Sequence, residues 1–310
     1  MEARADPVTQ VETGHARVGA IVLAYDLFGD PDHGRPLVLI MGIGAQRVMW
    51  DDVFCNQLVA RGFCVVRFDH RDVGESTRLD VPVPDPKRVL LRRLVGARID
   101  APYTLSDMAG DVGGLIDALG FGAAHIVGAS LGGMVGQHLA IEHPARVRSL
   151  VSIMSSPGAR RYVPEPRAMR ALFRPAPRSA AEAGQQVEKL FRTIGSTAWP
   201  IDGARLRAIG ERAFQRGLSP RGFLRHFAAV LASGDRRDRL RGVRVPTLVI
   251  HGSRDPMFSI RAGRDLAGLM PDATWLPIAG MGHDLPPPLW PTLVAAITRH
   301  AERADARSAR

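Results

Sequence analysis

Apolar runs of strand length alternate with segments of helical periodicity in the first half of the chain. Leu37 to Met41 is an unbroken apolar run, as expected of a parallel strand covered on both faces. Apolar residues then follow helical spacing from Asp51 to Arg61, and Gly62 ends that helix. The other strands predicted here are Val18 to Phe28 (as one or two strands), Phe63 to Phe68, Ala124 to Val127 and Val147 to Met154.

Two further helices complete this alternation. Thr104 and Asp107 form a capping-box-like pair at the start of the first helix, which Gly120 ends. The second helix is predicted to run from Leu131 to about His143, because a proline follows directly. Strands joined by helices in this way are typical of a parallel sheet.

The pattern changes after Ser155. From Ser156 to Arg241 the apolar spacing is helical, with interruptions by proline. The elements predicted beyond that segment are strands over Thr247 to His251 and Thr274 to Ile278, and helices over Ile260 to Met270 and Leu289 to Ala301. We therefore predict an α/β fold, a doubly wound, mostly parallel sheet with an inserted helical cap. The core would comprise residues 1–154 and 242–310, and the cap residues 155–241.

Composition and charge narrow the class of protein. The 310 residues carry a formal net charge of +10, but the arginines are scattered and aromatic residues make up only 6%, which argues against a nucleic-acid partner. We find neither a signal peptide nor a membrane span, and Cys55 and Cys64 suffice for neither a disulfide framework nor a metal site. We predict a cytoplasmic protein without cofactor or metal. Its polar ends, residues 1–10 and 301–307, are expected to fray.

The segment Gly128-Ala129-Ser130-Leu131-Gly132 lies between a predicted strand and a predicted helix. A strand-to-helix turn this tight strains the backbone of Ser130 and lifts its hydroxyl above the edge of the sheet. Side chains in place of Gly128 and Gly132 would collide with the neighbouring backbone. Ser130 is therefore the predicted nucleophile. The alternative is a serine that only caps the helix beside packing glycines.

A serine nucleophile also needs a base, an acid that orients this base, and donors for the oxyanion. His283 follows the last predicted strand, where the base is expected, and Asp255 follows the strand before it, where the acid is expected. His251 ends a strand and is interpreted as a packed structural residue. The predicted oxyanion donors are the backbone N–H groups of Leu131, next to the nucleophile, and Ile43, in the loop after Leu37 to Met41.

Several segments of the chain resemble the motifs of the α/β-hydrolase superfamily. They are Met41-Gly42-Ile43-Gly44, Asp69-His70-Arg71-Asp72-Val73-Gly74-Glu75-Ser76, Gly128-Ala129-Ser130-Leu131-Gly132-Gly133, His251-Gly252-Ser253-Arg254-Asp255 and Gly280-Met281-Gly282-His283. The second is similar to that of the anthracycline (aclacinomycin) methylesterases and related actinobacterial carboxylesterases. The resemblance spans about residues 20 to 300 apart from the cap.

This resemblance implies that Ser130, Asp255 and His283 are the catalytic set. It also implies that the loop from Asp69 to Ser76 supports the oxyanion turn through internal hydrogen bonds and an ion pair. The chain departs from the family at Met41, where a histidine usually precedes the glycine. Backbone donors tolerate that change, but contacts with substrate at this position would differ.

These residues predict a serine carboxylic-ester hydrolase, a carboxylesterase or methylesterase, that acts through an acyl-enzyme. One alternative is another reaction on the same triad, such as C–C hydrolysis, perhydrolysis or amide hydrolysis. The other is a non-catalytic binding protein with a hydrolase fold. A serine nucleophile argues against haloalkane dehalogenase chemistry, which needs a carboxylate.

The cap would cover Ser130 and select the substrate, a small-molecule ester with an apolar acyl or aromatic group. Cap residues such as Phe191 and Trp199 are available to line its pocket. The cap is also rich in arginine, Arg160 and Arg161 among others. A solvated basic face explains these arginines better than an anion-binding pocket does, but both interpretations stay open.

Overall fold

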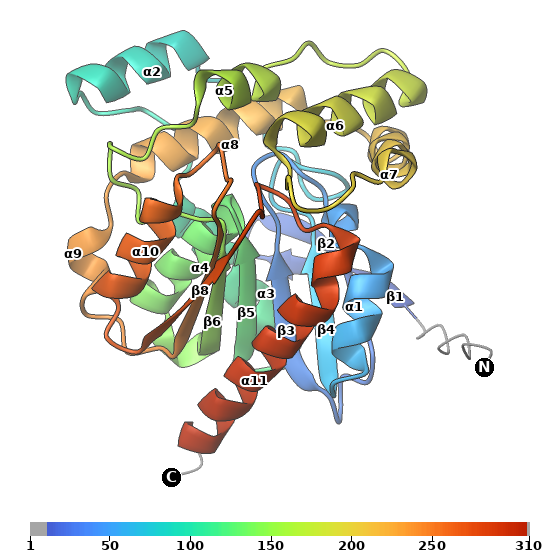
Figure 1. The fold of residues 1–310 in the computed structure, drawn as a ribbon, viewed down its shortest axis with the longest axis vertical. Helices are drawn as coiled ribbons and strands as arrows, with labels where there is room; N and C mark the ends of the chain where they lie inside the picture. Colours follow the sequence, from blue (N-terminus) through green and yellow to red (C-terminus); the bar gives the residue numbers. More distant parts are fainter. Residues whose placement is uncertain (1–10, 309–310) are drawn as a thin grey trace.

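A computed structural model describes residues 11–308, and within them the strands form one eight-stranded sheet (Figure 1). Its order is β1-β2-β4-β3-β5-β6-β7-β8. The strands are β1 (Val11–Val18), β2 (Ile21–Phe28), β3 (Arg35–Ile40), β4 (Phe63–Phe68), β5 (Ala124–Ala129), β6 (Val147–Ile153), β7 (Thr247–Gly252) and β8 (Ala273–Ile278). β2 is antiparallel to β1 and β4, and the other neighbours are parallel. The predicted fold class is confirmed.

Helices cover both faces of the sheet. They are α1 (Asp52–Val59), α3 (Leu105–Ala118), α4 (Leu131–Glu142), α10 (Ile260–Leu269) and α11 (Trp290–Ser308). Side chains of β3 alternate between the two faces, as in any strand. Val38 and Ile40 pack in the cluster that contains α3, α4 and α10, and Leu37 and Leu39 pack with α1 and α11. Burial on both faces explains the unbroken apolar run of this strand.

Further helices lie above the carboxyl edge of the sheet, at the top of Figure 1. Those between β6 and β7 are α5 (Pro166–Leu172), α6 (Ala180–Ile194), α7 (Gly203–Gln215) and α8 (Pro220–Ser233). The short α9 (Arg237–Leu240) follows α8 but lies lower, beside α10 (Figure 1). This segment is helical, as the apolar spacing predicted. An additional helix, α2 (Pro86–Val95), comes from the chain between β4 and α3 and packs beside α8. Single 3-10 turns lie at Arg47–Met49, Pro144–Arg146 and Pro287–Leu289.

Three elements differ from the predictions. The first strand begins at Val11 rather than Val18, and α2 was not predicted. Residues 302–308 do not fray, because α11 continues to Ser308 with Ala301 and Ala304 each 1% exposed. Residues 1–10, the other end expected to fray, lie outside the described residues.

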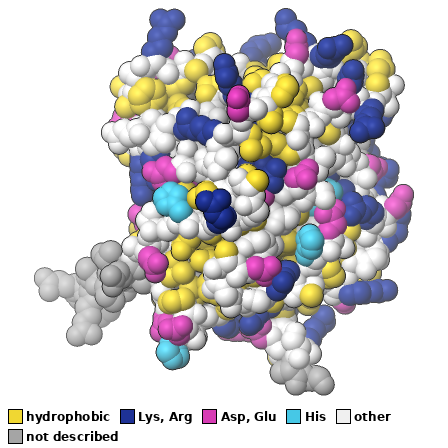
Figure 2. All heavy atoms as spheres, turned by 180° about the vertical axis from the view of Figure 1, so that it is seen from behind, with side chains coloured by type: hydrophobic (Ala, Val, Ile, Leu, Met, Phe, Trp, Pro, Cys, Tyr) yellow, Lys and Arg dark blue, Asp and Glu magenta, His cyan; other side chains and the backbone are white. Residues whose placement is uncertain are grey.

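Charge is dispersed over the face of the molecule seen in Figure 2. On this face, the Lys and Arg side chains alternate with Asp and Glu instead of forming one continuous basic patch. Cys55 and Cys64 are buried and free. Within residues 11–308 no helix has the length and apolar character needed to cross a bilayer.

Candidate active site

Ser130 occupies a strained turn between β5 and α4. Its backbone has φ 56° and ψ −116°, in a region that costs a non-glycine residue about 1–3 kcal/mol. The turn is held by two hydrogen bonds: the Ser130 N–H donates to the Ile153 carbonyl (2.9 Å) and the Ser155 hydroxyl donates to the Ser130 carbonyl (2.9 Å). The Ser130 side chain makes no capping bond to α4. The helix-cap interpretation is therefore wrong.

Glycine is needed on both sides of this serine. A Cβ on Gly128 would overlap the backbone carbonyl of Gly132, and a Cβ on Gly132 would overlap that of Ile40. The collisions predicted for these two positions are thus present in the fold. A Cβ on Gly42, by contrast, would make only an ordinary van der Waals contact, 3.5 Å from the Cβ of Ser130.

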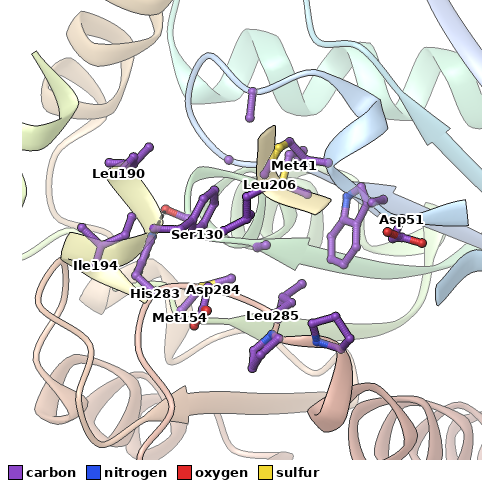
Figure 3. A pocket seen from close by; sticks show the side chains of 18 of the residues that line it. Met41, Asp51, Ser130, Met154, Leu190, Ile194, Leu206, His283, Asp284 and Leu285 are labelled. Carbon is purple, nitrogen blue, oxygen red and sulfur yellow. Dashed lines mark hydrogen bonds between the residues drawn. The ribbon is translucent and has the colours of Figure 1, made fainter. Parts of the chain in front are cut away.

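The structure brings Ser130, His283 and Asp255 together, although 153 residues separate the first two. Figure 3 shows Ser130 and His283 side by side. His283 Nε2 lies 2.9 Å from Ser130 Oγ, and His283 Nδ1 lies 2.8 Å from Asp255 Oδ2. The backbone N–H of His283 donates to the Ile194 carbonyl at 2.7 Å, which ties the loop after β8 to α6. His283 is only 9% exposed, so little solvent competes for its ring nitrogens.

Asp255 is held by its own loop. Its Oδ1 accepts the N–H groups of Met257 (2.7 Å) and Phe258 (3.0 Å). Burial alone would raise the pKa of Asp255, but the charges and hydrogen bonds of His283 and His251 outweigh burial and hold this pKa well below its usual range. The carboxyl group is therefore ionised at neutral pH. It is fixed in one orientation, with Oδ2 facing His283.

His251 is buried, as expected of a packed residue, and it also lies beside this carboxylate. Its Nε2 is 2.8 Å from the Phe258 carbonyl and 3.4 Å from Asp255 Oδ2. The sequence did not reveal this contact. Asp284, next to the predicted base, faces away from it and accepts hydrogen bonds from the N–H (2.8 Å) and hydroxyl (2.5 Å) of Ser196.

The predicted oxyanion donors belong to residues near Ser130. Leu131 is the first residue of α4, so its N–H has no partner within the helix. Ile43 follows β3 and lines the same cavity as Ser130. The next two N–H groups of that turn are engaged: Gly44 donates to His226 Nδ1 (3.2 Å) and Ala45 to the Gly42 carbonyl (3.3 Å).

The loop after β4 supports this turn, as the family resemblance implied. Asp69 accepts the backbone N–H of Arg47 (2.7 Å) and forms an ion pair with its guanidinium (2.5 Å). Arg216, from the end of α7, also reaches Asp69 (2.7 Å) and Glu75 (2.8 Å). All three elements of the support (the oxyanion turn, the loop and the helices above) therefore meet at one buried carboxylate.

Two buried histidines complete the support. His70 Nε2 donates to the Met41 carbonyl (3.0 Å), and His226 Nε2 donates to the Arg71 carbonyl (2.9 Å). Burial lowers the pKa of His70 to about 3, with a further contribution from His226, and burial lowers the pKa of His226 to about 4. Both rings are neutral at pH 7, which leaves His226 Nδ1 free to accept from Gly44. His226 comes from α8 and was not predicted to contribute.

An apolar cavity opens above Ser130 and His283 (Figure 3). Its apolar lining includes Met41, Trp50, Met154, Leu190, Phe191, Ile194, Trp199, Leu206, Leu285 and Trp290. Phe191 and Trp199 thus line a pocket, as expected of cap residues. Its charged residues include Arg205 and Asp51, which pair with each other at 3.3 Å.

Residues 35–286 match a protein-family model described as alpha/beta hydrolase fold. Rhodomycin D methylesterase DnrP of Streptomyces peucetius is 30% identical over 89% of this chain and 93% of its own length. Rhodomycin D methylesterase DauP of Streptomyces sp. (strain C5) is 29% identical over the same shares. Among solved structures, the enol-lactonase from Burkholderia xenovorans LB400 superposes with a TM-score of 0.70 at 22% identity, over 93% of this chain and 99% of that one.

The chain therefore belongs to the α/β-hydrolase fold family. The methylesterases among its relatives confirm the resemblance noted in the sequence, and they support its predicted class, a carboxylic ester hydrolase.

Proposed function

We propose that the protein hydrolyses carboxylic esters through an acyl-enzyme formed on Ser130. The observation that carries this proposal is the continuous hydrogen-bonded chain from Ser130 Oγ through His283 to Asp255, with separations of 2.9 and 2.8 Å. Its hydroxyl end opens into a cavity with a mainly hydrophobic lining, which is the lining typical of small-molecule sites.

We propose a role for each member that is consistent with this geometry. Asp255 Oδ2 accepts the proton on His283 Nδ1, so His283 Nε2 is unprotonated and can take the proton of Ser130 as its oxygen attacks the ester carbonyl. The imidazolium that forms is stabilised by the Asp255 carboxylate. It then donates its proton to the departing alcohol, and a water molecule releases the acyl group by the same steps in reverse order.

The oxyanion of each tetrahedral intermediate would accept the N–H groups of Leu131 and Ile43. These are backbone groups, so their identity as donors does not depend on either side chain. Each donor of this kind is worth about 10²–10³ in rate. The bonds from Gly44 to His226 and from Arg47 to Asp69 hold the Ile43 turn in place.

The cavity lining favours an ester with an apolar acyl or aromatic group. Helices of the segment 155–241 supply Leu190, Phe191 and Leu206 to this lining, which is the role proposed for that segment as a cap over the core. The particular ester is not defined by these side chains, since they select for apolar surface rather than for a specific polar group.

Turnover of short p-nitrophenyl esters tests the proposal. The variants Ser130→Ala and His283→Ala should each lose turnover by several orders of magnitude. Ser308→Ala and His33→Ala, remote from the cavity, are the matched controls and should retain wild-type rates. Full activity of either active-site variant would contradict the proposed mechanism.

A further inference from the structure

A second cavity also reaches Ser130. It shares Ser130, Ile43, Leu172 and Met257 with the first cavity and then runs between α2, α8 and the segment 156–164. Its apolar lining includes Met134, Met169, Phe227, Val230, Leu231 and Phe258. Leu94 (80% exposed) and Val163 (73% exposed) lie at the end that opens to solvent. Ser130 therefore lies between two apolar cavities, so that each could hold one of the two substituents of an ester.

Three arginines line this second cavity: Arg93 on α2, Arg160, and Arg236 just before α9. Two of them meet at Gly158. The guanidinium of Arg93 donates to the Gly158 carbonyl at 3.0 Å, and Arg236 Nη1 would lie 2.8 Å from a Cβ on that glycine. Arg160 packs over Gly96, which ends α2 (Nη2 would lie 2.9 Å from a Cβ there).

None of these three cations forms a salt bridge with a carboxylate of residues 11–308. Their neighbours differ. Arg161 pairs with Asp265 at 2.6 Å, and the carboxylate of Asp235 pairs with Arg237 at 2.7 Å. Other cap arginines, such as Arg167 and Arg192, are also neutralised by carboxylates, whereas those in the second cavity are not.

Arg236 is the strongest evidence, because it is only 1% exposed. Its guanidinium donates to neutral acceptors alone: the Gln137 side chain (3.1 Å) and the carbonyls of Gly234 (2.9 Å) and Ser156 (2.9 Å). Burial lowers the pKa of Arg236 to about 10, so it stays charged at pH 7. The neighbouring Asp235 attracts Arg236 but pairs with Arg237, so no carboxylate of the described residues contacts the buried cation, and such a cation is costly. A ligand anion would supply the missing charge.

We infer that this end of the second cavity binds a carboxylate of the substrate, while the ester lies at Ser130. The substrate class is then an anionic ester with an apolar stretch between its two polar ends. Gln137, the partner of Arg236, follows Ser130 by seven residues on α4, which is about 10 Å of helix and indicates the separation. This inference rests on the proposed function and adds the recognition of charge to it.

Matched ester pairs test the inference. The monomethyl esters of aliphatic dicarboxylic acids of increasing length are compared with their neutral dimethyl esters. Acetates of ω-hydroxycarboxylic acids are compared with acetates of the matching alcohols, so that either side of the ester can carry the charge. At one chain length the anionic member should have a kcat/KM roughly tenfold above its neutral partner, in line with a charge-assisted hydrogen bond.

The double variant Arg93→Gln/Arg160→Gln should abolish this preference. Both positions lie outside the salt bridges of the fold, so the substitution removes charge without breaking an ion pair. Arg170→Gln is the matched control, since Arg170 is an exposed arginine of α5 that lines neither cavity. Equal kcat/KM values within every pair, or a preference that survives in the double variant, would overturn the inference.

The two proposals fail in distinguishable ways. A wild-type enzyme that hydrolyses neutral esters without preferring anionic ones refutes the carboxylate site alone. Calorimetry with Ser130→Ala measures the same discrimination without turnover. The half-ester of the best chain length should bind roughly tenfold more tightly than the diester, and no difference in affinity would again refute the site.

Discussion

The substitution Asp255→Asn tests whether Asp255 orients the base His283, independently of its contribution to folding. In the wild type, Oδ1 accepts two backbone N–H groups and Oδ2 accepts the proton of His283 Nδ1. An asparagine keeps both backbone bonds only if its oxygen takes the Oδ1 position. Its NH₂ group then faces His283, so Nδ1 must become an acceptor and the ring proton moves to Nε2. That tautomer cannot accept the proton of Ser130.

The size of the effect follows from the cost of the other orientation. Turning the amide round would leave the buried N–H groups of Met257 and Phe258 without an acceptor, at about 1–3 kcal/mol each. The useful tautomer is therefore rare. We expect kcat on p-nitrophenyl butyrate at neutral pH to fall by about 10³–10⁴, as found when a triad acid is replaced by its amide. Asp255→Ala, which loses both backbone bonds, should lower the free energy of unfolding more than Asp255→Asn does.

Steady-state kinetics and urea unfolding on the same preparations provide the comparison. Asp265→Asn, on the outer helix α10, serves as the matched control and should retain activity. An Asp255→Asn variant that is folded and keeps more than a tenth of the wild-type rate would refute the reasoning, because another acid would then orient His283.

Two further predictions concern stability. Gly132→Ala should lower the free energy of unfolding by about 1–3 kcal/mol or more, because the new Cβ overlaps the Ile40 carbonyl. Gly110→Ala, which has open space in α3, is the control and should be neutral or slightly stabilising in the same urea titration. Equal effects of the two substitutions would contradict this prediction. Burial depresses the pKa values of His70 and His226 to about 3 and 4, from 6.5, so the unfolded chain binds more protons than the folded one between these values. Stability should therefore be level above about pH 7 and decrease on acidification by about 1.4 kcal/mol per pH unit for each histidine, and an unchanged free energy of unfolding at about pH 5 would refute this.

The sequence was sufficient for the parts of the site that rest on chain order. β5, β7 and β8 are parallel strands of one sheet, so the loops that follow them open at the same edge. The loop after β8 then extends along this edge past β7 and β6, which places His283 beside Ser130. The glycines on either side of Ser130 predicted the tight turn, because a side chain at Gly128 or Gly132 would collide with neighbouring backbone atoms.

The support of the oxyanion turn could not be predicted from local pattern. Gly44 and its acceptor His226 are 182 residues apart, and nothing in the helix that carries His226 indicates which loop it will meet. The same holds for Arg216 on Asp69 and for His251 beside Asp255. Such contacts depend on how the helices above the sheet pack against its carboxyl edge.

Two other differences had local signals of a weaker kind. Helix α2 begins at the capping residue Asp85, followed by Pro86, and ends at Gly96 with φ 76°. Its exposed leucines do not follow the helical spacing of a face that packs on the core, so hydrophobic periodicity did not predict this helix. At the C-terminal end of α11, the buried positions are the alanines Ala301 and Ala304. Their small side chains bury little area each, so apolar content alone underestimates how far that helix packs.

Covalent labelling tests the central claim most directly. The folded wild-type protein is treated with a fluorophosphonate, and the site of modification is located by mass spectrometry. We expect a single adduct on Ser130, with no labelling of Ser130→Ala and normal labelling of Ser308→Ala. A folded wild-type protein that is not modified, or an adduct that Ser130→Ala still forms, would contradict the assignment of Ser130 as the nucleophile.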